Sequence, residues 1–264
     1  MSRAAGDDAG GGRVSRRAFI GALSMLAACR TAKLSPEDAS VLGRIEARPR
    51  APRRPNGAPL GMLPLGAASG RDGLIYVPPG YRADQPAPLI VTLHGSDSGA
   101  KEGIAPFLPL ADDAGFILLA PESRARTWDI VLGAFGADVL FVNRAMIRVF
   151  DRYAIDPGRI AIEGFSDGAS EALSVGLTNG ELFTRIIAFS PGMVASTRGR
   201  GRPLIFDAHG ETDNTFPIAM TSRTIVRQLR AKGYHIDAHE FAEGHTVPPA
   251  IAKQAIEWLA ASWA

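Results

Sequence analysis

The sequence predicts an α/β domain built on a mainly parallel, twisted sheet that is flanked by helices. From about residue 74 onward, short apolar runs rich in β-branched residues alternate with longer amphipathic runs, which is the pattern of buried strands and covering helices. The chain has 264 residues, of which 46% are hydrophobic and 21% charged, so a single domain of this kind can bury a sizeable core.

The predicted elements alternate along the chain. We expect strands at residues 74–77, 89–94, 116–120, 160–163, 186–190, 203–208 and 236–241, and helices at residues 103–114, 137–153, 169–177, 219–232 and 248–261. Open parallel sheets bind their ligands beyond the carboxyl ends of the strands. Functional side chains are therefore expected directly after strands.

Composition and charge exclude several classes of protein. A single cysteine cannot form an internal disulfide or a Cys-rich zinc site. The 29 basic and 27 acidic residues give a net charge of +2, which is too balanced for a protein that binds nucleic acid through its phosphates. An enzyme or a small-ligand protein remains.

The N-terminal residues 1–28 predict an export signal of the twin-arginine type. Arg16 and Arg17 precede an apolar run over residues 18–28, which is about half the length that spans a membrane. Residues 26–29, Leu-Ala-Ala-Cys, resemble a lipobox, so Cys29 is the predicted lipidation site of an exported bacterial protein, periplasmic or membrane-anchored. The alternatives are a short buried helix, or cleavage without lipidation.

Residues 29–71 predict a linker, because they are rich in Pro, Arg and Gly and have little apolar periodicity. The catalytic domain is then expected over residues 72–264. These boundaries divide the chain into an export signal, a tether and one domain.

A Gly-x-Ser-x-Gly motif, Gly164-Phe165-Ser166-Asp167-Gly168, lies between a predicted strand and a predicted helix. In that context the motif forms a sharp turn that exposes the serine hydroxyl, so Ser166 is the candidate nucleophile. A serine hydroxyl needs a base to take its proton and a carboxylate to orient that base.

The candidate base is His245, because it lies in the loop after the last predicted strand. Asp213, in the loop after the preceding strand, is the candidate acid, with Glu211 as the alternative and Asp207 expected to be structural. The other histidines (His94, His209, His235 and His239) are expected to have structural or surface roles.

An oxyanion needs two hydrogen-bond donors, and one is expected to be the backbone N–H of Asp167, the residue after the nucleophile. The second is expected from the loop after residues 89–94, at the N–H of Ser96 or, as the alternative, Asp97. Phe165 and Trp128 are candidates for lining a substrate pocket, although both could serve only in packing.

Several motifs together resemble the α/β-hydrolase superfamily, in its phospholipase/carboxylesterase and polyhydroxybutyrate-depolymerase-like esterase branch, which also holds feruloyl esterases. They are the segment 76–81 (Tyr-Val-Pro-Pro-Gly-Tyr), the segment 93–95 (Leu-His-Gly), the serine motif, the segment 209–213 (His-Gly-x-x-Asp) and the segment 244–245 (Gly-His). The resemblance covers about residue 72 to the C-terminus.

The resemblance implies an α/β-hydrolase fold and a serine carboxylic-ester hydrolase that works through an acyl-enzyme without a metal or an organic cofactor. A nucleophilic serine departs from the cysteine of dienelactone hydrolases, and the single cysteine departs from disulfide-bonded secreted relatives. The short connection after residue 190 predicts no large lid domain. The expected partners are an ester substrate and, through Cys29, a membrane, but no nucleic acid. The alternatives are a serine peptidase of the same fold and a non-catalytic lipid-anchored binding protein.

Overall fold

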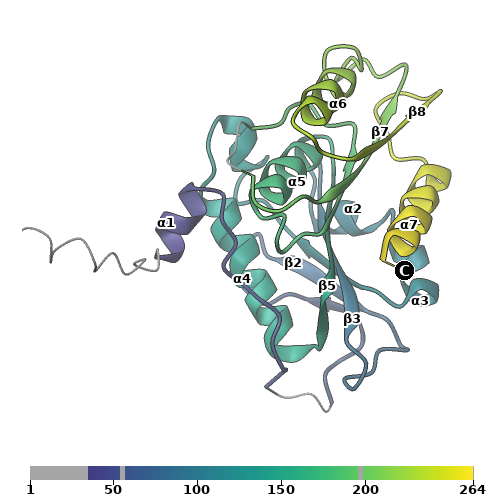
Figure 1. The fold of residues 1–264 in the computed structure, drawn as a ribbon. Coiled ribbons are helices and arrows are strands. Elements are labelled where there is room, and N and C mark those ends of the chain that lie inside the picture. Colours follow the sequence, from purple (N-terminus) through teal and green to yellow (C-terminus); the bar gives the residue numbers. More distant parts are fainter. Residues whose placement is uncertain (1–34, 54–56, 196–198, 264) are drawn as a thin grey trace, which may run out of the picture. The chain divides into compact units, whose positions relative to one another are not determined.

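An eight-stranded mixed sheet forms the centre of the structure, a computed structural model that describes residues 35–53, 57–195 and 199–263 (Figure 1). Its strand order is β1-β2-β4-β3-β5-β6-β7-β8; β1, β2 and β4 pair antiparallel, and every pair from β4 to β8 is parallel. The strands are β1 (Gly61–Pro64), β2 (Gly73–Val77), β3 (Ala87–Leu93), β4 (Ile117–Pro121), β5 (Ile155–Phe165), β6 (Arg185–Phe189), β7 (Leu204–Gly210) and β8 (Ile236–Phe241). This sheet confirms the predicted fold class.

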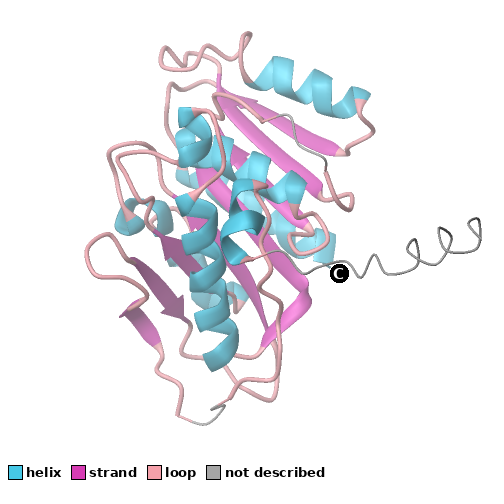
Figure 2. Cartoon of the chain, turned by 90° about the vertical axis from the view of Figure 1, so that its left-hand side faces the viewer, coloured by secondary structure: helices cyan, strands magenta, loops and turns pink. Residues whose placement is uncertain are grey.

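Helices cover both faces of the sheet (Figures 1 and 2). On one face α4 (Ala137–Arg152), α5 (Asp167–Thr178) and α6 (Ser222–Ala231) bury one side of each central strand, while α2 (Ala100–Ile104), η1 (Leu108–Leu110), α3 (Ala111–Ala114) and α7 (Pro249–Trp263) cover the other. The alternation is visible in β3, where Val91 belongs to the first core and Ile90 to the second. A sheet covered on both faces explains why its strands are apolar throughout.

Residues 35–53 and 57–71 are packed onto the domain, and this corrects the predicted linker from residue 35 onward. β1 adds to the sheet edge beside β2, with Met62 opposite Tyr76, and the helix α1 (Pro36–Val41) contacts α4. Ile45 is buried, and its backbone N–H donates to the Asn179 side-chain oxygen at 2.8 Å. The backbone N–H groups of residues 45–47 are thus satisfied by two buried amide side chains, those of Asn179 and of Asn143 in α4.

The helix expected over residues 103–114 is also corrected, because the chain forms three short helices there instead of one. Pro106 and Pro109 lie inside that range. A proline has no N–H to donate to the preceding turn, and its ring clashes with the carbonyl four residues earlier. The two prolines therefore break the chain into α2, η1 and α3.

The described parts of the connection from β6 to β7, residues 190–195 and 199–203, contain no helix, in accord with a fold that lacks a large lid domain. Within the described residues, none of the helices has the length and apolar character needed to cross a membrane. The predicted export signal and Cys29 lie outside the described residues.

Candidate active site

Ser166 lies at a strained turn between the carboxyl end of β5 and the first residue of α5. Its backbone has φ 59° and ψ −122°, a conformation that L-residues rarely adopt. The turn is tight because its glycines lack side chains: a Cβ on Gly164 would collide with the Gly168 carbonyl, and one on Gly168 with the Leu93 carbonyl. The local sequence therefore explains how the serine side chain is lifted above the end of the sheet.

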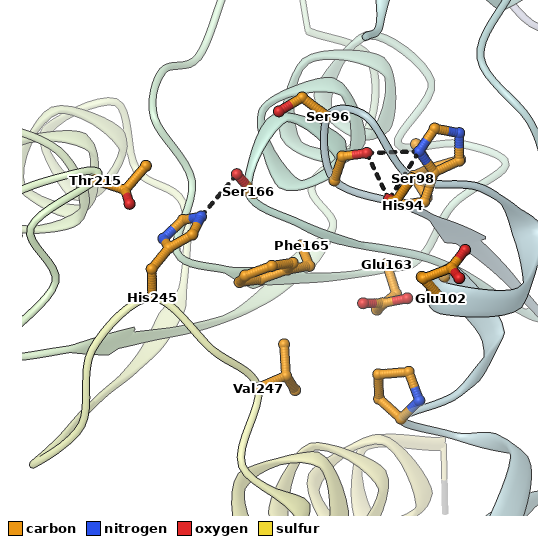
Figure 3. A pocket seen from close by; sticks show the side chains of 14 residues that line it. His94, Ser96, Ser98, Glu102, Glu163, Phe165, Ser166, Thr215, His245 and Val247 are labelled. Atoms are coloured by element: carbon orange, nitrogen blue, oxygen red, sulfur yellow. Dashed lines mark hydrogen bonds between the residues drawn. The ribbon is translucent and has the colours of Figure 1, made fainter. Parts of the chain in front are cut away.

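Three of the predicted site residues lie in one line of hydrogen bonds. His245, from the loop between β8 and α7, has its Nε2 2.8 Å from Ser166 Oγ, and its Nδ1 is 2.6 Å from Asp213 Oδ2 (Figure 3 shows the first contact). Ser166 is 6% exposed and Asp213 4%, while the His245 side chain is 19% exposed. An imidazole that is open to the pocket thus joins a buried carboxylate to the serine hydroxyl.

The Asp213 carboxylate is fixed on both of its oxygens. Oδ1 accepts hydrogen bonds from the backbone N–H groups of Thr215 and Phe216, both at 2.8 Å. Burial acts to raise the pKa of Asp213, but the bonds from His245 and from these two amides outweigh it and hold the pKa below its ordinary value. The alternative acid, Glu211, is exposed in the same loop.

The loop after β3 faces Ser166 from the other side of the site. Ser96 lines the cavity beside Ser166, whereas the Asp97 backbone N–H donates to the Arg126 carbonyl at 2.8 Å. That bond removes Asp97 as a free donor and leaves Ser96 as the candidate. The Asp167 N–H is at the first position of α5, where a helix has no internal acceptor for it.

A cavity of about 350 Å³ opens beside Ser166 (Figure 3). Phe165 lies between His245 and Glu163 in this view, and its ring centroid is 4.7 Å from that of His245. Phe165 and Val247 give the cavity apolar walls. Glu163 lines it as a buried carboxyl, 1% exposed, whose Oε2 has no hydrogen-bond partner, and burial raises the pKa of this carboxyl well above its usual range. Glu163 is not among the site residues predicted from the sequence, although an acidic residue inside an apolar strand is a signal that could have identified this carboxyl.

Trp128 does not line this cavity, and the structure corrects that candidate. Its side chain is fully buried, and its indole N–H donates to the His94 carbonyl at 2.7 Å. The same loop carries Thr127, whose hydroxyl donates to the Asp167 carboxylate at 2.6 Å. Trp128 therefore anchors a loop that supports the turn after Ser166.

Comparison with known proteins shows what this geometry is similar to. The phospholipase/carboxylesterase family model matches residues 142–262, which include the serine turn and both partner loops. An esterase from Thermogutta terrifontis superposes with a TM-score of 0.60 at 18% identity, over 84% of this chain and 95% of that one. These similarities show that the chain has the α/β-hydrolase fold.

The chain has further similarities to esterases. A probable feruloyl esterase C of Aspergillus flavus is 26% identical over 155 residues, which are 56% of this chain and 56% of that protein. A ferulic acid esterase of Anaeromyces mucronatus, solved in complex with ferulic acid, has a TM-score of 0.54 at 17% identity over 69% of this chain and 81% of that one. The chain thus spans just over half the length of the curated relatives it matches.

Two other histidines of the protein, His94 and His209, are buried. His94 accepts a bond from the Ser123 N–H at Nε2 and lies 2.7 Å from the Gly95 carbonyl at Nδ1, so it ties the loop after β3 to the loop after β4. His209, at the end of β7, lies beside Asp213, with 3.2 Å between Nε2 and Oδ2. The sequence predicted a structural role for both but gave no sign of this contact with the candidate acid.

Proposed function

We propose that the protein is a serine carboxylic-ester hydrolase in which Ser166 is the nucleophile, His245 the general base and Asp213 the acid that orients it. The observation that carries the proposal is the unbroken set of contacts from Ser166 Oγ through the His245 imidazole to Asp213, built on a strained strand-to-helix turn. The esterase relatives support the same reaction class.

The reaction would proceed through an acyl-enzyme. Ser166 Oγ attacks the ester carbonyl as its proton passes to His245 Nε2, and the resulting oxyanion accepts hydrogen bonds from the N–H groups of Ser96 and Asp167. Collapse of this intermediate breaks the ester C–O bond, and His245 returns the proton to the leaving alcohol. Water then hydrolyses the acyl-enzyme: it gives a proton to His245 and attacks the acyl carbon. The bond from the acyl carbon to Ser166 Oγ breaks, His245 returns the proton to Ser166, and the acid is released.

The substrate class that fits the cavity is an ester of an aromatic acid that carries a hydroxyl group. Phe165 and Val247 offer apolar contact for a ring. Burial raises the pKa of Glu163 well above its usual range and so favours the protonated carboxyl, which can both donate and accept a hydrogen bond. Thr92 is aligned with Glu163 across β3 and β5, and its buried hydroxyl also lacks a partner. The names of the feruloyl esterase relatives support this choice.

The test is hydrolysis of p-nitrophenyl acetate by purified protein. Ser166→Ala and His245→Ala should each lose activity by about three orders of magnitude or more while the thermal unfolding midpoint stays close to that of the parent. Equal activity in the parent and Ser166→Ala would refute the proposal. Short peptide substrates in the same assay test the peptidase alternative, which predicts amide cleavage at rates comparable with ester cleavage.

We also propose that residues 1–28 direct export and that Cys29 anchors the mature protein to a membrane by acylation. The proposal rests on the paired arginines, the short apolar run and the residues that precede Cys29. Palmitate labelling in a bacterial host should be lost in Cys29→Ala, and the variant should leave the membrane fraction. Absence of labelling in the parent protein would contradict lipidation.

A further inference from the structure

The hydrogen bonds of the site continue beyond Asp213, away from Ser166. His209 Nε2 lies 3.2 Å from Asp213 Oδ2 and 2.8 Å from the Phe216 carbonyl, while its Nδ1 is 2.7 Å from Ser222 Oγ. Ser222 Oγ is in turn 3.2 Å from Asp207 Oδ1. Asp207 and His209 lie two residues apart on β7, and Ser222 begins α6, which covers that face. All four side chains are buried.

The acceptors around His209 determine where its proton lies. A carbonyl oxygen and a carboxylate oxygen both face Nε2, so Nε2 must carry a hydrogen. Burial lowers the pKa of His209 and outweighs the bond to the Phe216 carbonyl, which acts to raise it, so the ring is neutral and Nδ1 is an acceptor. The single hydroxyl hydrogen of Ser222 then points to Nδ1, and Ser222 Oγ can receive a hydrogen from Asp207 only if Asp207 is protonated.

We propose that Asp207, Ser222 and His209 form a hydrogen-bond relay that positions Asp213, and that the relay is aligned when Asp207 is protonated. The Asp207 hydroxyl then donates to Ser222, and Ser222 donates to His209 Nδ1. The His209 Nε2–H is shared between the Phe216 carbonyl at 2.8 Å and the Asp213 carboxylate at 3.2 Å. Asp213 Oδ2 thus faces a hydrogen of His209 as well as His245 Nδ1. The inference rests on the proposed function, in which Asp213 orients the general base.

Ionised Asp207 reverses the direction of the relay. The Ser222 hydroxyl would then donate to Asp207, as the geometry of that contact also allows, and His209 Nδ1 would need a hydrogen to donate to Ser222. A neutral ring that carries its hydrogen on Nδ1 turns the lone pair of Nε2 toward the Phe216 carbonyl and the Asp213 carboxylate. Asp213 would lose a donor and face a repulsive neighbour, and its hold on His245 would weaken.

The surroundings of Asp207 favour its protonated form below neutral pH. The residues aligned with it on the neighbouring strands are Ala188 and Ala238, and the charged groups that act on it are Arg230 of α6 and Glu240 of β8. Burial, opposed by the bond from Ser222, raises its pKa to about 7. A second cavity of about 250 Å³, lined by Asp207 and Ser222 but not by Ser166, gives this end of the relay a route for protons that is separate from the substrate cavity.

The tautomer of His209 tests the relay directly, and it can be measured by long-range ¹H–¹⁵N correlation on the full chain. We expect the Nε2–H form at about pH 6 and a change in the ring between about pH 7 and pH 8.5, with that change absent in Asp207→Asn, whose amide mimics the protonated acid. This measurement does not depend on turnover, so it remains informative if the proposed esterase activity fails. A His209 ring that carries its hydrogen on Nδ1 at about pH 6, or one that titrates alike in both proteins, overturns the relay.

The second test is the pH profile of kcat/KM with p-nitrophenyl acetate. We expect kcat/KM of the parent to decline above about pH 7. For Asp207→Asn we expect a kcat/KM that is within about twofold of the parent maximum and stays there up to about pH 9. Ser222→Ala should lower kcat by about tenfold with little change in KM, because it breaks the relay without touching the substrate cavity. Asp237→Asn, on the adjacent strand and outside the relay, is the matched control and should keep the parent profile. Identical profiles for the parent and Asp207→Asn would contradict the proposal.

Discussion

Replacing Asp213 by asparagine changes a single oxygen to an NH₂ group, and the structure fixes which oxygen must change. The backbone N–H groups of Thr215 and Phe216 both donate to Oδ1, so the asparagine side chain must keep its oxygen there. The NH₂ group is therefore forced into the place of Oδ2, where it faces His245 Nδ1 at 2.6 Å.

The consequence for His245 follows from its two nitrogens. With an amide donor opposite Nδ1, the neutral ring must accept there and carry its hydrogen on Nε2, which is the atom that has to take the proton of Ser166. We expect Asp213→Asn to lower kcat by about 10³-fold to 10⁴-fold, a loss of about 4 to 5.5 kcal/mol of transition-state stabilisation. KM should change little, because Asp213 does not line the substrate cavity.

The assay is steady-state hydrolysis of p-nitrophenyl acetate, with circular dichroism and thermal unfolding to establish that the variant is folded. Glu211→Gln, an exposed residue in the same loop, is the control and should retain activity within about twofold of the parent. If Asp213→Asn keeps more than about a tenth of the parent kcat, or if Glu211→Gln loses activity by a similar factor, the assignment of the acid is refuted.

Three further predictions follow from the same geometry. Gly168→Ala should abolish activity and lower the unfolding midpoint, because a Cβ there collides with the Leu93 carbonyl; a fully active variant would contradict the tight turn. Glu163→Leu should lower kcat/KM about tenfold for methyl 3-(4-hydroxyphenyl)propionate but leave kcat/KM for methyl 3-phenylpropionate within about twofold, because only the first ester has a hydroxyl group to bind Glu163. Equal effects on both esters would refute this role of Glu163. Burial and, secondarily, Asp138 and Asp129 raise the pKa of Glu171 to about 8, so the folded protein holds a proton that the unfolded chain releases, and the free energy of unfolding should fall as pH rises from about 4.5 to 8. Glu171→Gln should recover about 2 to 4 kcal/mol of this loss in denaturant unfolding at about pH 8, and a variant with the parent's pH dependence would contradict the role of Glu171.

The elements around the serine motif were predictable because their signals are local. β8 has the expected bounds, residues 236–241, and α4 differs from the prediction only at its last residue. The motif around Ser166 depends on two glycines and on its place between a strand and a helix, and both are visible in the sequence. The order of the partner loops follows from the strand order of such sheets.

The rest of the structure depends on contacts between distant residues. Residues 35–53 and 57–71 have the composition of a linker, yet the backbone of residues 45–47 is bound by the side chains of Asn143 and Asn179, more than 90 residues away. Trp128 could face either a pocket or the interior, and only the position of the His94 carbonyl decides that it points inward. The contact of His209 with Asp213 similarly requires the turn from Gly210 to Asp213 to fold back over β7.

The central claim is that Ser166 is an activated nucleophile, and covalent labelling tests it most directly. A fluorophosphonate probe followed by peptide mass spectrometry should give one adduct, on Ser166, which is absent in Ser166→Ala and forms at least about 10²-fold more slowly in His245→Ala. A folded parent protein that gives no adduct, or an adduct on another serine, would contradict the account.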